Sequence, residues 1–469
     1  MRVLMVSDVY FPRVNGVSTS IETFRQALAA EGVEVRLVAP RYADEAEVEG
    51  IVRIPGRAVP RDPEDRLVSW TALRAAVRRE AVDCDLIHVQ TPFLAHYAGV
   101  SAARSLGKPV IATYHTLFEA YLQHYAPFLP AEWLRGLARR LSRSQCNALD
   151  AVVVPSTAMR ERLEQYGVNV PMHVLPTGIP MGRFTQGEGP RFRARHGLAA
   201  DQPCALFVGR VAFEKNIDFL IESLALARRD VPDLILLITG EGPAERALHR
   251  QAAALGLSEA VRFVGYLDRQ RDLPDCYAAA DCFVFASRTE TQGLVLLEAM
   301  AMGLPVVALA VMGTRDILSP GLGCLVPEDD VIAFAAAMVR LLRDPPLRSR
   351  LSQEARDYAR EWADDRMAAK LAECYRRILK AAECPPAGVA PARATQRDTA
   401  EVKRAWTAAR WCSHCRKFRC ARFCRFDPGC IAIACGGFEV AFDERHQGVS
   451  LSAPESFSSG PGSSSFNKV

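Results

Sequence analysis

The sequence predicts an α/β protein with two doubly wound, Rossmann-like domains that face each other across a cleft. Two observations support this fold class. Short apolar runs of strand length alternate with helix-length segments through residues 1–185, and the same alternation restarts near residue 204. Such alternation is typical of a parallel sheet with helices on both faces. We therefore expect domains at 1–185 and 195–365, a Gly- and Pro-rich linker at 175–197, and a helix near 356–380 that packs back on the first domain.

The first half begins with a strand, a loop and a helix. A capping box from Thr19 to Glu22 predicts the start of that helix, and Gly32 predicts its end. The strands expected in this half are RVLMVS (2–7), VEVRLVAP (33–40), DLIHVQ (85–90), PVIATYH (109–115) and AVVVP (151–155). The later helices are expected near 69–81, 94–106, 131–149 and 157–166.

The second half repeats this organisation with strands that read as fully buried. These strands are CALFVGR (204–210), LILLITG (234–240), VRFVG (261–265), CFVFAS (282–287) and PVVALAV (305–311). A helix at 216–230 follows the first of them. Apolar runs of this length, rich in β-branched residues, are typical of parallel strands buried on both faces.

The composition is that of a globular protein, with 49% apolar residues, 24% charged residues and a net charge of +4. The apolar run in MRVLMVSDVYFP is too short for a signal peptide. Scattered cysteines in a chain without such a signal are usually buried, reduced thiols. We therefore expect a cytoplasmic protein, with any membrane contact peripheral at the inner face of the cell membrane.

The tail at 385–469 differs in composition, being rich first in Cys and Arg and then in Ser and Gly. We expect it to be disordered. The side chains that suggest a small zinc site there are Cys412, His414, Cys415, Cys420 and Cys424. Their spacing matches no standard zinc motif. The interleaved basic residues also suggest weak nucleic-acid or lipid contact, but we favour an extension without a metal or a nucleic-acid partner.

The stretch TETQGLVLLEAMAMGLPVVALAVMG (289–313) is long and apolar enough to suggest a membrane span. Gly303 and Pro305 break any helix in its middle, and Glu298 would be costly in a bilayer. The stretch instead predicts a helix that begins near Gln292, capped by Thr289 or Thr291, followed by a buried strand.

The start of this helix is a candidate anion site. Its first N–H groups, near Gly293 and Leu294, lack partners within the helix and lie at the positive end of its dipole. Glu290 precedes the site and Glu298 follows it, so the two carboxylates could each accept hydrogen bonds from a diol, one on a sugar and one on a ribose. The alternative is that both glutamates are ordinary surface charges.

A second motif, FVGRVAFEKN, places Arg210 and Lys215 after a buried strand, at the edge of the sheet where ligands of open α/β sheets bind. Each cation alone would more often be a surface charge. Together with the two glutamates they suggest a site for a diphosphate leaving group, whose growing negative charge needs cationic partners.

At these motifs the chain resembles the family 4 glycosyltransferases, which are retaining enzymes with the GT-B fold. ETQGLVLLE matches the family's Glu-x7-Glu motif. The resemblance implies that Arg210 and Lys215 hold the donor diphosphate, that Glu290 contacts the sugar, and that Glu298 contacts the ribose. It also implies roles for four positions in donor binding, through the backbone or the base-binding edge: Gly293, Leu294, Gly265 and Tyr266.

The first domain matches the family less tightly. Gly16 stands after Asn15 where the family often has two adjacent glycines, and its backbone could still approach a phosphate. His115, at the end of a strand, matches the family histidine that contacts the donor sugar. A lone histidine in such a place is more often structural, and it is the resemblance that favours a sugar contact.

The stretch YHTLFEAYLQHY looks like the segment that follows this histidine in diacylglycerol glucosyltransferases, with Glu119, Tyr121, His124 and Tyr125 in the acceptor region. The helix that follows has an apolar stripe of Trp133, Leu134, Leu137 and Leu141. Its arginines are Arg135, Arg139, Arg140 and Arg143. This composition suits an anionic membrane surface. The alternative is a plain amphipathic helix packed on the domain.

The resemblance implies a retaining, metal-independent hexosyltransferase with no cofactor. The domain at 1–185 would bind the acceptor, and the domain at 195–365 would bind the nucleotide sugar. The donor would be a nucleotide sugar, similar to UDP-glucose or GDP-mannose, and the acceptor a membrane lipid such as diacylglycerol. The alternatives are a phosphatidylinositol or soluble saccharide acceptor, or a non-catalytic protein that binds a nucleotide sugar. A nicotinamide dehydrogenase is disfavoured because the first turn, SDVYFPRVNGVS, lacks G-x-G-x-x-G.

Overall fold

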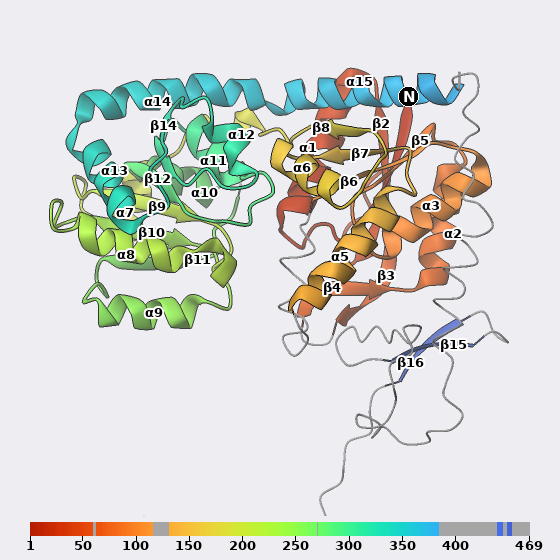
Figure 1. Ribbon diagram of the computed structural model, residues 1–469, viewed down its shortest axis with the longest axis horizontal. Coiled ribbons are helices and arrows are strands. Elements are labelled where there is room, and N and C mark those ends of the chain that lie inside the picture. The colour runs from red at the N-terminus through yellow and green to blue at the C-terminus, as the bar shows by residue number, and fades with distance from the viewer. Residues whose placement is uncertain (60–61, 116–130, 270, 384–438, 444–447, 453–469) are drawn as a thin grey trace, which may run out of the picture. The chain divides into compact units, whose positions relative to one another are not determined.

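The computed structural model describes residues 1–59, 62–115, 131–269, 271–383, 439–443 and 448–452. The chain divides into two units, Met1–Cys384 and Pro385–Val469. The first unit contains two parallel sheets with helices packed around each (Figure 1). This arrangement confirms the predicted class of two doubly wound, Rossmann-like domains.

The first sheet has eight strands in the order β4-β3-β2-β1-β5-β6-β7-β8. Every pairing in it is parallel except that of β3 with β4. The strands are β1 (Arg2–Val6), β2 (Glu34–Arg41), β3 (Ile51–Val59), β4 (Asp62–Val68), β5 (Leu86–Val89), β6 (Val110–Thr113), β7 (Ala151–Val154) and β8 (Met172–Val174).

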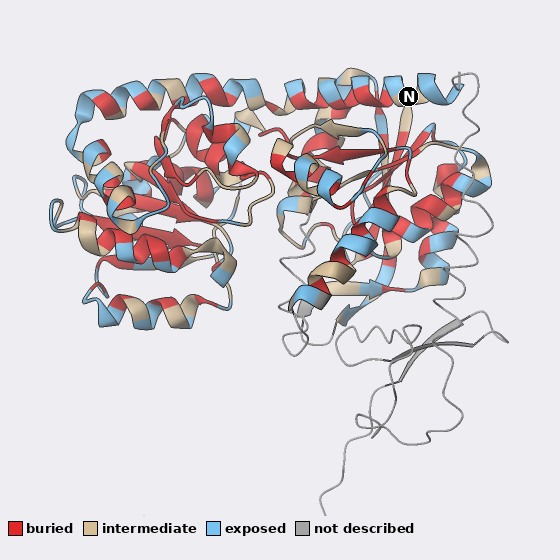
Figure 2. Ribbon diagram, viewed as in Figure 1, coloured by how far each residue is buried: buried red, intermediate tan, exposed pale blue. Residues whose placement is uncertain are grey.

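Helices cover both faces of this sheet, and each face has its own apolar core. One face carries α2 (Trp70–Ala81), α3 (Leu94–Leu106), α5 (Ala131–Cys146) and α6 (Thr157–Gln165). The other carries α1 (Gly16–Ala27), the 3-10 turn η1 (Leu28–Glu31) and the C-terminal helix α15 (Asp364–Glu383). Figure 2 shows buried residues along the strands and on the inner sides of the helices.

The second sheet has six parallel strands in the order β11-β10-β9-β12-β13-β14. They are β9 (Cys204–Val208), β10 (Ile235–Thr239), β11 (Val261–Gly265), β12 (Cys282–Phe285), β13 (Val306–Ala308) and β14 (Cys324–Leu325). The surrounding helices are η3 (Phe213–Lys215), α8 (Ile217–Ala227), α9 (Glu245–Ala254), α10 (Asp272–Ala278), α11 (Leu294–Ala301), α12 (Thr314–Leu318), α13 (Val331–Arg343) and α14 (Pro345–Ala359). The strand order reverses between β9 and β12, where ligands of such sheets bind.

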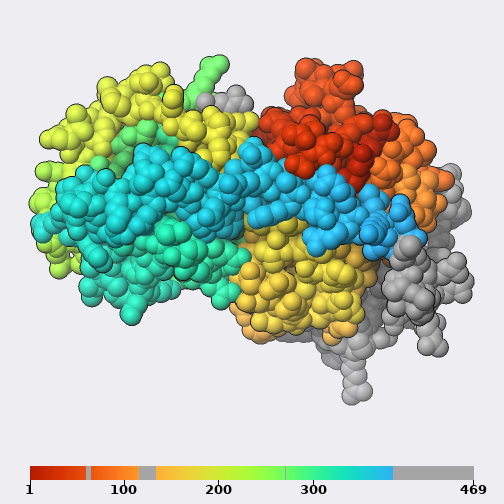
Figure 3. Space-filling view, turned by 90° about the horizontal axis from the view of Figure 1, so that it is seen from above, coloured from red at the N-terminus to blue at the C-terminus, as the bar shows by residue number. Residues whose placement is uncertain are grey.

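The chain crosses between the two domains twice. The first crossing follows β8 and leads through η2 (Met181–Arg183) to α7 (Gly189–Arg195). The second runs from α14 through η4 (Arg360–Trp362) to α15, and these helices lie along one side of both domains (Figures 1 and 3). The crossings touch at a parallel bridge between Ile179 and Ala363. The helix expected near 356–380 is thus two helices with a break, and the second packs on the first sheet through Met367, Leu371 and Tyr375.

Several local predictions were wrong. The strands β3, β4, β8 and β14 were missed, because half-exposed strands at or near a sheet edge lack a continuous apolar run. Asn15, not Thr19, caps α1: its side-chain oxygen accepts from the Ser18 amide. In the tail the structure describes only the antiparallel pair β15 (Glu439–Asp443) and β16 (Gly448–Ser452).

The apolar stretch 289–313 forms α11 and β13, as predicted, with a turn between them. Gly303, in that turn, has a left-handed φ of 72° that suits glycine. Among the described residues, no helix combines the length and the apolar character that crossing a bilayer requires.

Candidate active site

Two loops meet at the carboxyl edge of the second sheet and bring together opposite charges. Lys215 ends the 3-10 turn η3 that follows β9, and Glu290 lies in the loop between β12 and α11. The Lys215 ammonium donates to Glu290 Oε2 at 2.6 Å. About a fifth of each side chain is exposed, so the pair is accessible from solvent yet partly shielded from it. Arg210, two residues after the end of β9, is exposed.

The turn before α11 is shaped by Gly293, which has φ 98° and ψ 49°. This left-handed conformation favours glycine. Gly293 is itself the N-cap and no side chain caps the helix, so the predicted start near Gln292 and the caps at Thr289 or Thr291 were wrong. The backbone at Glu290 is fixed by a hydrogen bond: the Gly313 amide donates to the Glu290 carbonyl at 2.9 Å. The first N–H groups of α11, beginning at Leu294, are therefore not covered by a capping side chain.

Glu298 lies inside the domain rather than on its surface, with only 2% of the residue exposed. Its carboxylate pairs with Arg269 and accepts a hydrogen bond from the Tyr277 hydroxyl at 3.0 Å. Burial raises the pKa of the Tyr277 phenol well above its usual value, so that group stays protonated and donates. Glu298, predicted to contact a ribose, therefore has Arg269 and Tyr277 as its neighbours, and the side chain of Arg269 is about a quarter exposed.

The predicted base-binding edge follows β11. Gly265 has a left-handed φ of 76°, and its carbonyl accepts from the Gly240 amide and the Thr239 hydroxyl. Tyr266, next in the chain, is more than half exposed. The Gly265 backbone is thus hydrogen-bonded to residues at the end of β10, while the ring of Tyr266 is exposed and accessible to a ligand.

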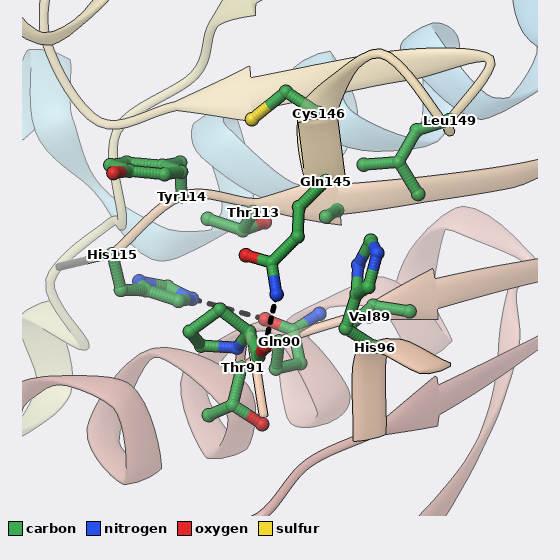
Figure 4. A pocket seen from close by; sticks show the side chains of 12 residues that line it. Val89, Gln90, Thr91, His96, Thr113, Tyr114, His115, Gln145, Cys146 and Leu149 are labelled. Atoms are coloured by element: carbon green, nitrogen blue, oxygen red, sulfur yellow. Dashed lines mark hydrogen bonds between the residues drawn. The ribbon is translucent and has the colours of Figure 1, made fainter. Parts of the chain in front are cut away.

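His115 follows β6 in the first domain and lies beside a small cavity (Figure 4). One ring nitrogen, Nε2, is 3.1 Å from the amide oxygen of Gln90. Since that oxygen can only accept, Nε2 carries the proton and Nδ1 is left as an acceptor. Burial lowers the pKa of His115 to about 4, so the ring is neutral at pH 7.

Gly16 opens helix α1 at the carboxyl edge of the first sheet. It is exposed, and a side chain there would meet no protein atom within 4 Å. The neighbouring loop is fixed by Asp8, which accepts from the Thr91 hydroxyl at 2.7 Å and from the Ala95 amide at the start of α3. Burial raises the pKa of Asp8 to about 6.

Helix α5 presents a basic face. Arg139, Arg140 and Arg143 are exposed, while Arg135 pairs with Glu132 one turn away. The predicted apolar stripe is buried at one end and exposed at the other, because Leu134 is buried and Leu141 is exposed. The domain-facing side of the helix includes Leu134, Ala138, Ser142, Gln145 and Cys146. The side chain of Trp133 and residues Glu119, Tyr121, His124 and Tyr125 lie outside the described residues.

The cysteines that the structure describes are all free and buried. Over the described ranges, no group of three or more His, Cys, Asp or Glu side chains is placed to hold a metal ion. The tail cysteines from Cys412 to Cys424 fall outside these ranges.

Sequence reasoning missed several residues that contact the predicted ones. Gln90 contacts His115, while Arg269 and Tyr277 contact Glu298. Thr291, proposed as a cap, instead donates from Oγ1 to the His115 carbonyl at 3.1 Å. Gln90 ends a predicted strand, which was a usable signal. The other contacts join segments that are far apart in the sequence, so no local sequence pattern indicates them.

Two family models match the chain. The model described as "Glycosyltransferase Family 4" matches residues 14–183, and "Glycosyl transferases group 1" matches residues 189–358. An alpha-monoglucosyldiacylglycerol synthase of Streptococcus pneumoniae is 33% identical over 66% of this chain and 71% of that protein. A GDP-mannose-dependent alpha-mannosyltransferase of Mycobacterium tuberculosis is 30% identical over 68% of this chain and 82% of that protein.

The fold is also found in solved structures. A sucrose-phosphate synthase of Thermosynechococcus elongatus superimposes with a TM-score of 0.68 at 24% identity, over 81% of this chain and 99% of that one. This likeness identifies the fold as GT-B. With both halves matched by family models and 30–33% identity to curated relatives, the chain belongs to the family 4 glycosyltransferases.

Proposed function

We propose that this glycosyltransferase moves a hexosyl group from a nucleotide sugar to a hydroxyl of a membrane lipid such as diacylglycerol, with retention at the anomeric carbon. The observation that carries the proposal is the Lys215–Glu290 pair beside the uncapped start of α11. It puts a cation and a carboxylate at the ligand-binding edge of the sheet, in the loops next to a helix start that no side chain caps.

The donor diphosphate binds where these groups converge. The N–H groups at the start of α11 and the ammonium of Lys215 face the phosphates, and exposed Arg210 adds a second cation. As the bond to the sugar breaks, negative charge grows on the diphosphate and these contacts strengthen. Fixed cations thereby take the place of a metal ion, and no cofactor takes part.

Glu290 and His115 orient the sugar. The Glu290 carboxylate accepts hydrogen bonds from sugar hydroxyls, and neutral His115 offers Nδ1 as a further acceptor. The acceptor hydroxyl attacks from the face that the diphosphate leaves, and the departing diphosphate oxygen takes its proton. Attack on that face retains the anomeric configuration.

The acceptor side supports a lipid substrate. Exposed Arg139, Arg140 and Arg143 form a basic face on α5. Apolar side chains are exposed on α5 and around the start of α3: Leu141, Phe93 and Tyr97. Gln145 of α5 donates to Tyr97 and to the Pro92 carbonyl, so these two regions adjoin. Basic residues beside exposed apolar groups suit the interface of an anionic membrane.

The test is a matrix of donors and acceptors. UDP-glucose and GDP-mannose are each incubated with the full chain and with one of three acceptors: vesicles that contain diacylglycerol, vesicles that contain phosphatidylinositol, or a soluble saccharide. We expect release of one nucleotide together with a glycosylated diacylglycerol. Transfer only to phosphatidylinositol or to a soluble sugar would overturn the choice of acceptor. No transfer from any donor would overturn the proposed activity.

A further inference from the structure

Thr291 and Gln292, the two residues of the donor-side turn that follow Glu290, hydrogen-bond to the first domain. Gln292 is 6% exposed and Thr177, its partner, is 4% exposed. The Thr177 amide donates to Gln292 Oε1 at 2.8 Å, and Gln292 Nε2 donates to the Thr177 carbonyl at 2.7 Å. A side-chain amide thus pairs with both backbone groups of one residue, and we call this pair of bonds the amide clasp.

The clasp holds the chain where it crosses between the domains. Thr177 lies two residues before Ile179, whose amide donates to the Trp362 carbonyl and whose carbonyl accepts from the Asp364 amide. Gly178 fits against the backbone of Asp364 so closely that a Cβ would come within 2.5 Å of it. The two segments that cross between the domains are therefore packed together next to Thr177, the residue to which Gln292 is hydrogen-bonded.

The clasp also reaches helix α1 of the first domain. The Thr177 hydroxyl is 2.7 Å from the hydroxyl of Ser20, and both residues are buried. Ser20 lies one turn after Gly16, which opens α1. Hydrogen bonds through Thr177 therefore connect the donor-side turn to α1, whose first residue, Gly16, is exposed.

Thr291 makes a second set of contacts across the same junction. Its hydroxyl donates to the His115 carbonyl at 3.1 Å, and its own carbonyl accepts from the Ser156 hydroxyl at 2.8 Å. Ser156 is itself fixed, because it caps α6 and is 1% exposed. Thr291, the residue after Glu290, is therefore hydrogen-bonded to the backbone of His115.

We propose that Gln292 and Thr291 are positioning residues that dock the donor-side turn on the first domain, so that Glu290 and His115 act on one sugar. This inference rests on the proposed function for its kinetic consequence. The docking contacts themselves are independent of what the donor is. The turn thus has two roles: Glu290 contacts Lys215 at the candidate donor site, and the two residues after Glu290 contact the other domain.

The test uses four variants of the full chain. Gln292→Met keeps the side-chain size and removes both bonds of the clasp. Thr291→Val removes the hydroxyl, while Thr291→Ser keeps it. Gln353→Met is the matched control, because Gln353 is on α14, where its amide bonds only to Asp357 in an exposed pair.

The first measurement does not depend on enzymatic activity. Amide hydrogen exchange is followed in peptides that contain Thr177, whose N–H loses its acceptor in Gln292→Met. We expect exchange there to become about 10-fold faster or more in Gln292→Met, with no change in Gln353→Met. Unchanged exchange in a folded Gln292→Met protein would overturn the clasp.

The second readout is kinetic, with UDP-glucose and GDP-mannose as the donors. Misplaced reacting groups slow the chemical step, so kcat should fall about 10- to 100-fold in Gln292→Met and Thr291→Val. The KM for the donor should change less than about 3-fold, since its contacts lie elsewhere on the turn. Thr291→Ser should retain kcat.

The outcomes separate the two proposals. If the wild type transfers sugar and the folded variants keep its kcat, the positioning role is wrong and the activity stands. If the wild type transfers nothing while exchange at Thr177 responds as expected, the activity is wrong and the docking contact stands. If Gln292→Met fails to fold, the Thr291→Val and Thr291→Ser pair decides, because equal kcat in the two overturns the proposal.

Discussion

The Lys215 ammonium lies 2.6 Å from the Glu290 carboxylate, and this contact joins the loop after β9 to the loop after β12. These two strands are neighbours in the sheet and mark the reversal in strand order. Charges of opposite sign at this position hold each other in place before a donor binds. The diphosphate and the sugar can then engage one partner each.

Removing either partner should slow transfer strongly without unfolding the protein. We expect Lys215→Ala and Glu290→Gln to lower kcat/KM by about 100-fold or more, because each removes a contact that strengthens in the transition state. Initial rates with the preferred donor measure this.

The control for that experiment is Arg288→Ala, which removes an exposed ion pair with Asp329 two residues before Glu290. Exposed pairs contribute little, so we expect less than about 2-fold change in rate. Equal losses in Arg288→Ala and Glu290→Gln would contradict a specific role for Glu290.

The contact between Gln90 and His115 predicts a shift in the pH profile. In the wild type the pKa of His115 is lowered to about 4, so its titration should not appear between pH 5.5 and 8. A carboxylate in Gln90→Glu would face Nε2 and raise the pKa of His115. The kcat/KM of this variant should therefore fall as the pH drops through that raised pKa. A profile identical to that of the wild type would show that Gln90 does not control His115.

Buried His88 predicts that acid lowers stability. Its ring bonds to the Tyr375 hydroxyl on α15 and to Thr113, and burial lowers its pKa to about 3. Below pH 6.5 the unfolded chain takes up a proton that the folded chain does not, so the free energy of unfolding falls by about 1.4 kcal/mol per pH unit from this group. The pKa of Asp8 is raised to about 6, so this carboxylate takes up its proton in the folded chain before it does so in the unfolded chain. Asp8 therefore raises the free energy of unfolding as the pH falls from 6 to 4.

The experiment compares wild type with His88→Gln, which keeps the polar contacts and cannot titrate. Urea unfolding at pH 7, 6 and 5 should give a shallower loss of stability in the variant, by about 1.4 kcal/mol per pH unit. Parallel pH dependence in the two proteins would mean that His88 is not buried in its neutral form.

The Arg269–Glu298 pair predicts a cost in stability as well as in donor binding. Arg269→Met leaves the carboxylate of Glu298 buried with Tyr277 as its remaining partner among the contacts described above. Removing one member of a buried pair typically costs about 3 kcal/mol, and the partial exposure of Arg269 reduces this to about 2 kcal/mol. Thermal unfolding measures the effect. Arg262→Met, which removes an exposed pair with Glu259, should change stability by less than about 0.5 kcal/mol.

The basic face of α5 predicts salt-dependent binding to anionic vesicles. Replacing Arg139, Arg140 and Arg143 by Gln should weaken sedimentation with phosphatidylglycerol vesicles by about 100-fold, at about 1 kcal/mol for each arginine.

The control has the same change in charge at three exposed arginines of the second domain: Arg229, Arg246 and Arg250. Binding that weakens equally in the control would indicate a general charge effect rather than a membrane face on α5.

Buried central strands were predictable from sequence, because β1 and β9 are short apolar runs that only a covered parallel sheet explains. The meeting of Lys215 and Glu290 was also predictable in outline, since both follow strands whose carboxyl ends share one edge. The partners of Glu298 were not. Arg269 is 29 residues away in sequence, and its approach depends on how the loop after β11 packs against α11.

Contacts between the two domains could not be predicted from the sequence either. Thr177 and Gln292 are 115 residues apart, and neither belongs to a periodic pattern. A polar residue between two motif glutamates reads as exposed, yet Gln292 is buried because the crossing segment covers it. Pairing of this kind depends on tertiary packing, which local propensity does not encode.

The most direct test of the account is the anomeric configuration of the product, measured by proton NMR on the lipid fraction after reaction with UDP-glucose or GDP-mannose and diacylglycerol vesicles. A retaining transfer that depends on Lys215 predicts an α-linked hexosyl lipid from the wild type and, in the same time, about 100-fold less of it from Lys215→Ala. A β-linked product, or hexose released only to water, would contradict it.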